Sequence, residues 1–173
     1  GPNGTGKTTL LNCLLGLRRQ KKGGIILDGT DLSKLRIKER SKLMAYVPQS
    51  TGLSFSYEVW EVAMMGRVSH LNYGAGHSGT DREIVMDALE KLQISHLAPR
   101  HFPELSGGEK QMVLVARAMV QQAKYLIMDE PTASLDYGNQ IRVLRAIRYL
   151  AEEGFGVLMT SHNPDHAFLA CSR

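Results

Sequence analysis

The first nine residues, GPNGTGKTT, restrict the fold of this chain more than any other feature of its sequence. They match the pattern G-x-x-x-x-G-K-[ST], in which glycines let backbone N–H groups curl around phosphate oxygens because side chains would block the approach. Lys7 would reach the β- and γ-phosphates of a nucleotide, and the Thr8 hydroxyl would bind Mg²⁺. Such a loop opens a helix whose positive end faces the anion, so we predict a helix over residues 7–17.

The composition is that of a folded globular protein, because 43% of the 173 residues are hydrophobic and 22% are charged. The net charge of +4 is scattered except at residues 18–22, which we interpret as the solvated end of a helix. We therefore expect no nucleic-acid partner. Cys13 and Cys171 are far apart, which favours a reducing cytosol over a disulfide framework. No apolar stretch is long enough to predict a membrane helix, so any link to a membrane would come through a partner.

Strand and helix patterns alternate along the chain, which predicts an α/β fold with a mostly parallel sheet covered by helices on both faces. The predicted strands cover residues 23–29, 43–49, 124–130 and 155–162. Further helices are predicted over residues 140–151 and from residue 164 onward. We expect one domain, with a catalytic core of residues 1–49 and 124–173. Residues 50–123 read as a helical insertion with its own small core.

The segment YLIMDE, residues 125–130, runs four apolar residues into two carboxylates. A buried strand that ends in acids places them at the carboxyl edge of the sheet, where α/β folds bind ligands. Asp129 would hold the Mg²⁺ shell, and Glu130 would act as a general base on the water that attacks the γ-phosphate. Alone, an Asp-Glu pair after a strand is more often a turn or a helix N-terminus; together with the glycine-rich loop it indicates nucleotide hydrolysis.

The segment LSGGEKQ, residues 105–111, is the most informative stretch of the chain. Ser106 and Glu109 form an S-x-x-E capping box, which predicts that a helix starts here. Two glycines in a first helical turn lower its stability, so a purely structural interpretation leaves them unexplained. They are understandable if this turn must lie against a flat, charged group such as a nucleotide phosphate.

Six motifs together resemble the nucleotide-binding subunit of ATP-binding-cassette (ABC) proteins, in order and spacing, over essentially the whole chain. They are GPNGTGKT, PQ at 48–49, LSGGEKQ, LIMDEP, SLD at 134–136 and SH at 161–162. The resemblance implies a P-loop NTPase with a RecA-like core, in which residues 50–123 are the signature subdomain. It also implies a dimer of two cassettes facing head to tail, with ATP between the glycine-rich loop of one and the signature of the other. We expect the partner to be a second copy of the same subunit, with a different cassette as the alternative.

The same resemblance implies the site residues. The nucleotide-binding set is Gly1, Asn3, Gly4, Thr5, Gly6, Lys7, Thr8, Thr9, Gln49, Ser106, Gly107, Gly108, Gln111 and Asp136. The implied Mg²⁺ ligands are Thr8, Gln49 and Asp129, and the implied catalytic groups are Lys7, Glu130 and His162. In this scheme residues 106–108 grip the γ-phosphate of an ATP held by the partner, Asp136 crosses the interface, and His162 contacts the γ-phosphate. Without the family, Gln49 and His162 would be ordinary polar residues.

Residues 56–67, SYEVWEVAMMGR, are apolar on more than one face, which fits either the core of the insertion or a groove for a short helix of a membrane subunit. The surrounding sequence looks most like importers of iron–siderophore, haem or cobalamin complexes. The implied partners are permease subunits and, indirectly, a solute-binding protein, at the cytoplasmic face of the cell membrane. Importers of molybdate or zinc remain alternatives, as does a translation factor. A chromosome or repair ATPase would need a heptad-repeat insertion, which is not present.

Members of the family place a strand directly before the glycine-rich loop, and an aromatic residue that stacks on adenine further upstream. The chain starts on the loop itself. We therefore expect it to be a fragment of a cassette that lacks N-terminal strands, and to fold poorly and bind ATP weakly by itself.

Overall fold

Three parallel strands form the centre of the molecule in the computed structural model, which describes residues 5–49, 56–71, 76–163 and 165–166. The strands are β3 (Met44–Val47), β4 (Tyr125–Asp129) and β5 (Gly156–Thr160), in the order β3-β4-β5. The pairing sets Asp129 directly opposite Thr160, at the carboxyl ends of β4 and β5. The predicted α/β class with a parallel sheet is therefore confirmed.

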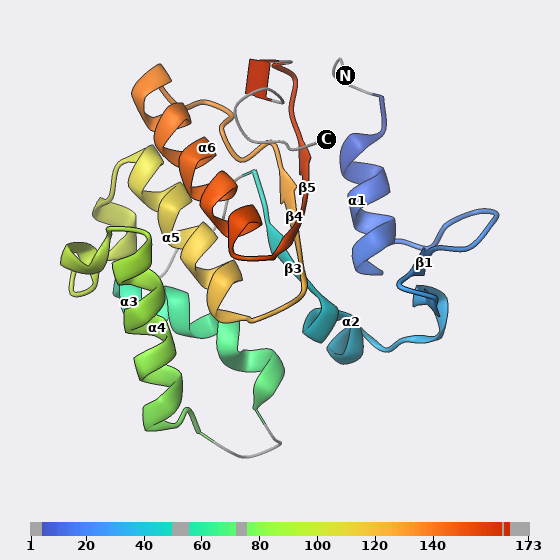
Figure 1. Ribbon diagram of the computed structural model, residues 1–173, viewed down its shortest axis with the longest axis horizontal. Coiled ribbons are helices and arrows are strands. Elements are labelled where there is room, and N and C mark those ends of the chain that lie inside the picture. The colour runs from blue at the N-terminus through green and yellow to red at the C-terminus, as the bar shows by residue number, and fades with distance from the viewer. Residues whose placement is uncertain (1–4, 50–55, 72–75, 164, 167–173) are drawn as a thin grey trace.

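Helices cover both faces of this sheet (Figure 1). The helix α1 (Lys7–Leu15) packs on one face, whereas α5 (Gly107–Val120) and α6 (Tyr137–Glu152) pack on the other. The remaining α-helices are α2 (Ile37–Leu43), α3 (Val59–Met64) and α4 (Gly79–Lys91). Within the described residues there are also four short 3₁₀ segments, η1 (Leu32–Lys34), η2 (Met65–His70), η3 (Ser95–Leu97) and η4 (Phe102–Glu104).

Alternate residues of the strands supply two hydrophobic cores, as the period of a β-strand requires. Met44 and Ile127 join Leu11 of α1 and Leu32 in the smaller core. The larger core takes the other face of the strands and continues without a break into α3, α4, α5 and α6. The proposed division into residues 1–49 with 124–173 and residues 50–123 thus stays a prediction, and its two parts share this larger core.

The core interpretation of the segment at residues 56–67 is supported by α3, in which Val59, Val62, Ala63 and Met64 are buried. The next turn, η2, is fixed by a buried ion pair between Arg67 Nε and Asp81 Oδ1 of α4, at 2.8 Å. The Arg67 guanidinium also donates to the Val120 carbonyl at 2.9 Å. One side chain therefore joins η2, α4 and the end of α5.

Some elements differ from the prediction. The predicted strand at residues 23–29 is a small hairpin of β1 (Ile26–Leu27) and β2 (Thr30–Asp31), closed by the expected Asp-Gly turn with positive φ at Asp28 and Gly29. The helix α1 ends at Leu15, because Gly16 adopts φ 77°. The helix α2 was not predicted, and none of its residues is fully buried. The helix predicted from residue 164 falls largely outside the described residues.

Among the described residues, no helix has the length and apolar character that crossing a bilayer requires. The basic segment at residues 18–22 follows α1, and its four charged side chains are exposed, in agreement with a solvated helix end.

Gly66 is a position where the fold requires a glycine. A Cβ atom built there would overlap the carbonyl oxygen of Arg117 and the side chain of Val120, where η2 crosses α5. We expect Gly66→Ala to lower the free energy of unfolding by about 1–3 kcal/mol through overpacking, measured by urea denaturation. Gly79→Ala is the matched control, because nothing lies within 4 Å of a Cβ at this helical position. Equal stability of the two variants would contradict the predicted close packing.

Candidate functional site

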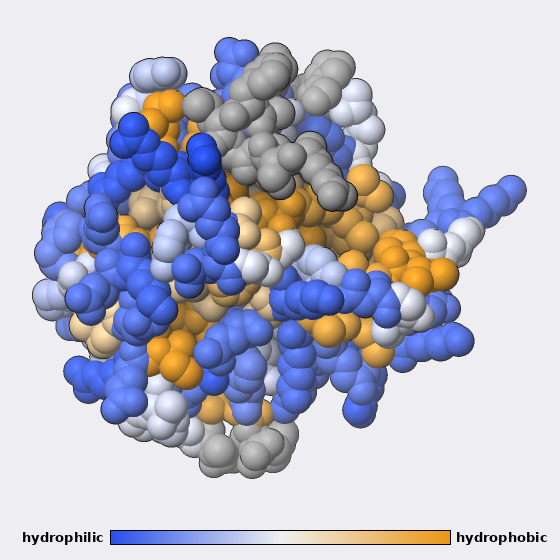
Figure 2. All heavy atoms as spheres, viewed as in Figure 1, coloured by the Kyte–Doolittle hydropathy of each residue, from blue (hydrophilic) through white to orange (hydrophobic). Residues whose placement is uncertain are grey.

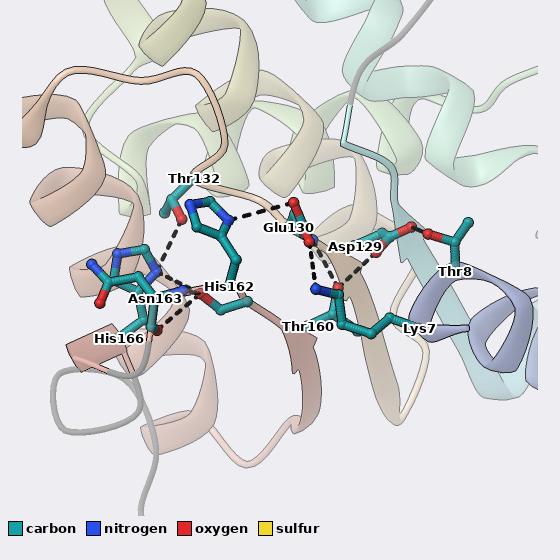
Figure 3. A network of polar contacts seen from close by, with 10 residues as sticks. Lys7, Thr8, Asp129, Glu130, Thr132, Thr160, His162, Asn163 and His166 are labelled. Carbon is teal, nitrogen blue, oxygen red and sulfur yellow. Dashed lines mark hydrogen bonds and ion pairs between the residues drawn. The ribbon is translucent and has the colours of Figure 1, made fainter. Parts of the chain in front are cut away.

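The Asp129 carboxylate lies at the carboxyl edge of the sheet and joins two hydroxyl groups (Figure 3). Thr8, in the first turn of α1, donates its hydroxyl to Asp129 Oδ2 at 2.8 Å. Thr160, at the end of β5, donates to Asp129 Oδ1 at 2.6 Å. Asp129 is only 3% exposed, so its two oxygens rely on these hydrogen bonds in place of water.

Glu130 follows directly and has φ 45°, the left-handed conformation that costs a residue with a side chain about 1–3 kcal/mol. Its backbone N–H donates to Thr160 Oγ1 at 3.0 Å, which helps to hold this conformation. The side chain turns toward two cationic or titratable groups (Figure 3). Lys7 Nζ lies 2.9 Å from Oε1, and His162 Nδ1 lies 3.5 Å from Oε2.

The Lys7 ammonium holds the pKa of Glu130 below its usual value, against the opposing effect of burial. A nearby His162 acts in the same direction. The carboxylate is therefore ionised at neutral pH. Because the pKa is lowered in the folded state, the stabilisation is present above the ordinary glutamate pKa and is lost as pH falls through the lowered value.

An open cleft of about 460 Å³ lies over this network. Its lining comes from the N-terminal turn of α1, from the end of β3 and from the end of β4, and consists of Thr5, Gly6, Lys7, Thr8, Thr9, Gln49 and Glu130. Gly6 has φ 86° at the N-terminus of α1, which explains the glycine directly before the lysine. Gly1, Asn3 and Gly4 lie outside the described residues.

The segment at residues 105–111 starts α5 as predicted, since Ser106 and Glu109 form the capping box. The structure explains Gly108 in a way that the sequence did not indicate. A Cβ atom at this position would overlap the side chain of Asn139 in α6. Asp136 caps α6, and its carboxylate accepts from the backbone N–H and the side-chain amide of Asn139. Gln111 is buried in α5, and its Nε2 has no hydrogen-bond partner among the described residues.

The structure thus brings one part of the predicted set together and leaves another apart. Lys7, Thr8, Asp129, Glu130 and His162 form one network, and Gln49 lines its cleft. The described lining of the cleft includes none of the residues Ser106, Gly107, Gly108, Gln111 and Asp136.

Sequence reasoning missed Thr160, which contacts both Asp129 and the Glu130 backbone. Its only signal was its position directly before the Ser-His pair, at the end of a predicted strand. It also missed His166, a buried histidine that contacts Thr132 and Ser161.

A second cavity, of about 350 Å³, lies between the end of α1, α2, η2 and α5. Leu17, Ile37 and Met65 supply apolar side chains to it, and Arg117 and Gln121 also line it. Leu17 and Ile37 are 62% and 67% exposed. Figure 2 shows apolar surface gathered over α1 and the neighbouring β1–β2 hairpin.

Comparisons with known proteins point to one family. A family model described as ABC transporter matches residues 1–133. An uncharacterised ABC transporter ATP-binding protein of Haemophilus influenzae is 46% identical, over 96% of this chain and 64% of its own length. The hemin import ATP-binding protein HmuV of Gloeobacter violaceus is 39% identical, over 94% of this chain and 61% of its own length.

A solved ABC transporter of metal-chelate type, in an inward-facing conformation, matches this structure with a TM-score of 0.87 and 36% identity. The match covers 98% of this chain and 63% of the solved one. The chain therefore spans a little under two thirds of the length of these proteins.

The contacts of Thr160 predict the effect of removing its hydroxyl. Thr160→Val keeps the branched shape but leaves the Glu130 N–H and one Asp129 oxygen without this partner. We expect a loss of about 1–3 kcal/mol in the free energy of unfolding, measured by urea denaturation. Thr160→Ser retains the hydroxyl and should lose much less. If the valine variant is as stable as the serine variant, the hydroxyl does not hold this edge of the sheet.

Proposed function

The chain belongs to the ABC transporter family, and on this premise we propose that it forms the ATP-hydrolysing site of an importer's ATPase subunit. The observation that carries the proposal is the network at the carboxyl edge of the sheet. There a lysine and a glutamate line one open cleft at a helix N-terminus, and an aspartate and a histidine are bonded to the residues of that lining. These are the groups that phosphoryl transfer requires, since it depends on positioning and electrostatics more than on covalent chemistry.

The residues of the cleft fit Mg²⁺ bound together with nucleotide phosphates. Among the described residues there is no cluster of three or more His, Cys, Asp or Glu side chains that would hold a metal alone. Thr8 and Asp129 instead bring oxygen atoms together, and Gln49 adds an amide at the cleft. Oxygen ligands in small number, completed by phosphate, suit Mg²⁺. When bound, Mg²⁺ would neutralise charge on the β- and γ-phosphate oxygens.

Glu130 is the proposed general base, and Lys7 and His162 are proposed to contact the γ-phosphate. The structure supports a change of partner for Lys7, because its ammonium is bound to Glu130 and a phosphate would compete for it. If Lys7 binds phosphate and leaves Glu130, its hydrogen bond, the main cause of the lowered pKa of Glu130, is lost. The carboxylate then becomes a stronger base toward a water molecule held between it and the phosphate.

A second copy of the cassette is proposed as partner, and the position of residues 106–108 supports it. These residues start α5, on the opposite side of the sheet from α1 (Figure 1). They take no part in the described lining of the cleft next to Lys7. The first turn of α5 nevertheless presents exposed Ser106 and Gly107 at a helix N-terminus, which favours an anion. In the proposal, that anion is the γ-phosphate bound to the partner, and Asp136 and Gln111 belong to the same interface.

The second cavity is the proposed docking site for a short helix of a permease subunit. Exposed apolar side chains at Leu17 and Ile37 give such a helix a surface to bury. Met65, which the sequence left open between core and groove, lines this cavity. Docking there would hold the subunit at the cytoplasmic face of the membrane, with a solute-binding protein on the other side.

The proposed solute is a metal chelate such as an iron complex, haem or cobalamin. Similarity to a hemin import protein and to a metal-chelate type transporter supports this class. The division into a catalytic core (residues 1–49 and 124–173) and a helical signature subdomain (50–123) is part of the same proposal.

Replacing the proposed base tests the activity directly. In the full-length protein, we expect Glu130→Gln to bind ATP but to hydrolyse it at least about 100-fold more slowly, because a general base contributes roughly 10²–10⁴-fold. The variant should also accumulate as an ATP-bound dimer on size-exclusion chromatography. Phosphate release and ATP binding are measured on the same preparation.

Glu152→Gln is the matched control, since Glu152 is exposed on α6 and, within the described part of the chain, forms an ion pair only with Arg148. This control should hydrolyse ATP at the parent rate. Hydrolysis by Glu130→Gln at the parent rate would refute the assignment of the base.

A charge in the second cavity tests the permease partner. Ile37→Asp should weaken assembly with the permease about tenfold or more, because burying an isoleucine side chain is worth about 1.5–3 kcal/mol. ATP binding should be unchanged. Ile26→Asp is the control, as Ile26 is 72% exposed but does not line the cavity. Assembly is measured by co-purification in detergent, and equal assembly of both variants would exclude this docking site.

A further inference from the structure

His166 is a buried histidine beside the proposed site, and none of the proposed roles uses it. It is 4% exposed, and Figure 3 shows its ring on the far side of His162 from Glu130. Burial lowers the pKa of His166, and the neighbouring His162 adds to the effect. Its imidazole is therefore uncharged at neutral pH, and any role it has depends on hydrogen bonding.

One ring nitrogen of His166 contacts two separate segments. Nδ1 lies 3.2 Å from Thr132 Oγ1 and 3.0 Å from Ser161 Oγ. Thr132 belongs to the turn that follows β4, and Ser161 lies in the loop that follows β5. Ser161 Oγ donates its proton to the Asn163 carbonyl at 3.1 Å, so toward His166 it accepts, and Nδ1 carries the ring proton. Ser161 Oγ and Thr132 Oγ1 share that one N–H.

Each of these two segments carries a residue of the proposed site in a local turn. In the first, the Ala133 N–H donates to the Glu130 carbonyl at 3.0 Å. In the second, the Asn163 N–H donates to Ser161 Oγ at 3.0 Å, which closes a turn around His162. His166 therefore contacts the neighbours of both Glu130 and His162.

The His162 side chain itself is 58% exposed, so packing does little to fix its position. Its Nδ1 lies 3.5 Å from Glu130 Oε2. Ser161, the residue directly before His162, makes the polar contact with His166. The contacts of His166 with Ser161 and Thr132 can therefore hold the loop that contains His162 against the turn that follows Glu130.

Resting on the proposed function, we propose that His166 is a positioning residue. Its Nδ1 ties the loop of Ser161 and His162 to the turn of Thr132, and so keeps the His162 ring beside Glu130. The ring does not touch the cleft, and it acts on turnover only through His162.

Three variants separate the hydrogen bond from simple packing. His166→Asn places a polar atom where Nδ1 was, because that atom is bonded to Cγ in both side chains. His166→Gln places it one bond further, at the position of Nε2. His166→Leu fills much of the space without a polar atom. Thermal unfolding of each variant reports how much of its effect is loss of stability.

We expect His166→Leu and His166→Gln to lower kcat for ATP about tenfold to 100-fold, as a displaced group in a site commonly does. KM for ATP should change little, because Lys7 and Thr8 are not disturbed. His166→Asn should retain most of the parent kcat. If the leucine variant does not fold, the pair of Asn and Gln variants decides the comparison.

A double-mutant cycle with His162→Ala tests the route of the effect. If His166 acts through His162, then His166→Gln should lower kcat little further in the His162→Ala background. Equal effects in both backgrounds, or equal kcat of the Asn and Gln variants, would overturn the inference while leaving ATP hydrolysis intact. A parent protein without ATPase activity would instead refute the proposed function.

An NMR measurement tests the inference without turnover. The imidazole ¹H–¹³C signal of His162, identified by its loss in His162→Ala, should move in His166→Gln and stay near its parent position in His166→Asn. An unmoved signal in both variants would overturn the positioning role.

Discussion

The site depends on the buried carboxylate of Asp129 and on how its two oxygens are used. One accepts from Thr8 of α1 and the other from Thr160 of β5, so a single side chain joins the helix and two strands. A carboxyl group that is 3% exposed is tolerated only when hydrogen bonds or a bound cation compensate for its lost hydration. The bond with Thr160 follows from the parallel register of β4 and β5, which sets Asp129 opposite Thr160. The packing of Leu11 with Ile127 supplies the other by holding α1 against β4.

Glu130, one residue later, has the opposite character. Its backbone is strained at φ 45° and its side chain faces the cleft, where Lys7 binds it at 2.9 Å. An ion pair with a lysine makes a carboxylate a weaker base, so the conformation seen is one in which the proposed base is restrained. The proposal therefore links the arrival of phosphate to the release of the base. Lys7 would bind either the Glu130 carboxylate or the nucleotide phosphate, and a close contact with one would weaken its contact with the other.

Much of this arrangement follows from the sequence, and the rest follows from tertiary contacts that a sequence does not display. Asp129 and Glu130 were located correctly because a buried apolar run that ends in acids must deliver them to the sheet edge. Thr160 became visible only through the register of β4 and β5. The contacts of His166 could not be predicted, because Thr132 and Ser161 lie 29 residues apart in the sequence and meet only in the folded chain. The helix α2 was missed because none of its residues is fully buried, and Leu43 packs only in part against the smaller core.

Gly108 shows how a correct motif can carry an incomplete explanation. The sequence suggested that residues 107 and 108 are small so that a phosphate can approach. In the structure, Gly108 is small because Asn139 packs against it, and Asn139 is in turn fixed by both oxygens of Asp136. The first turn of α5 and the cap of α6 are therefore one packed unit. If both face a partner cassette, as proposed, Asn139 is the side chain through which a shift at Asp136 would press on the turn that begins at Ser106.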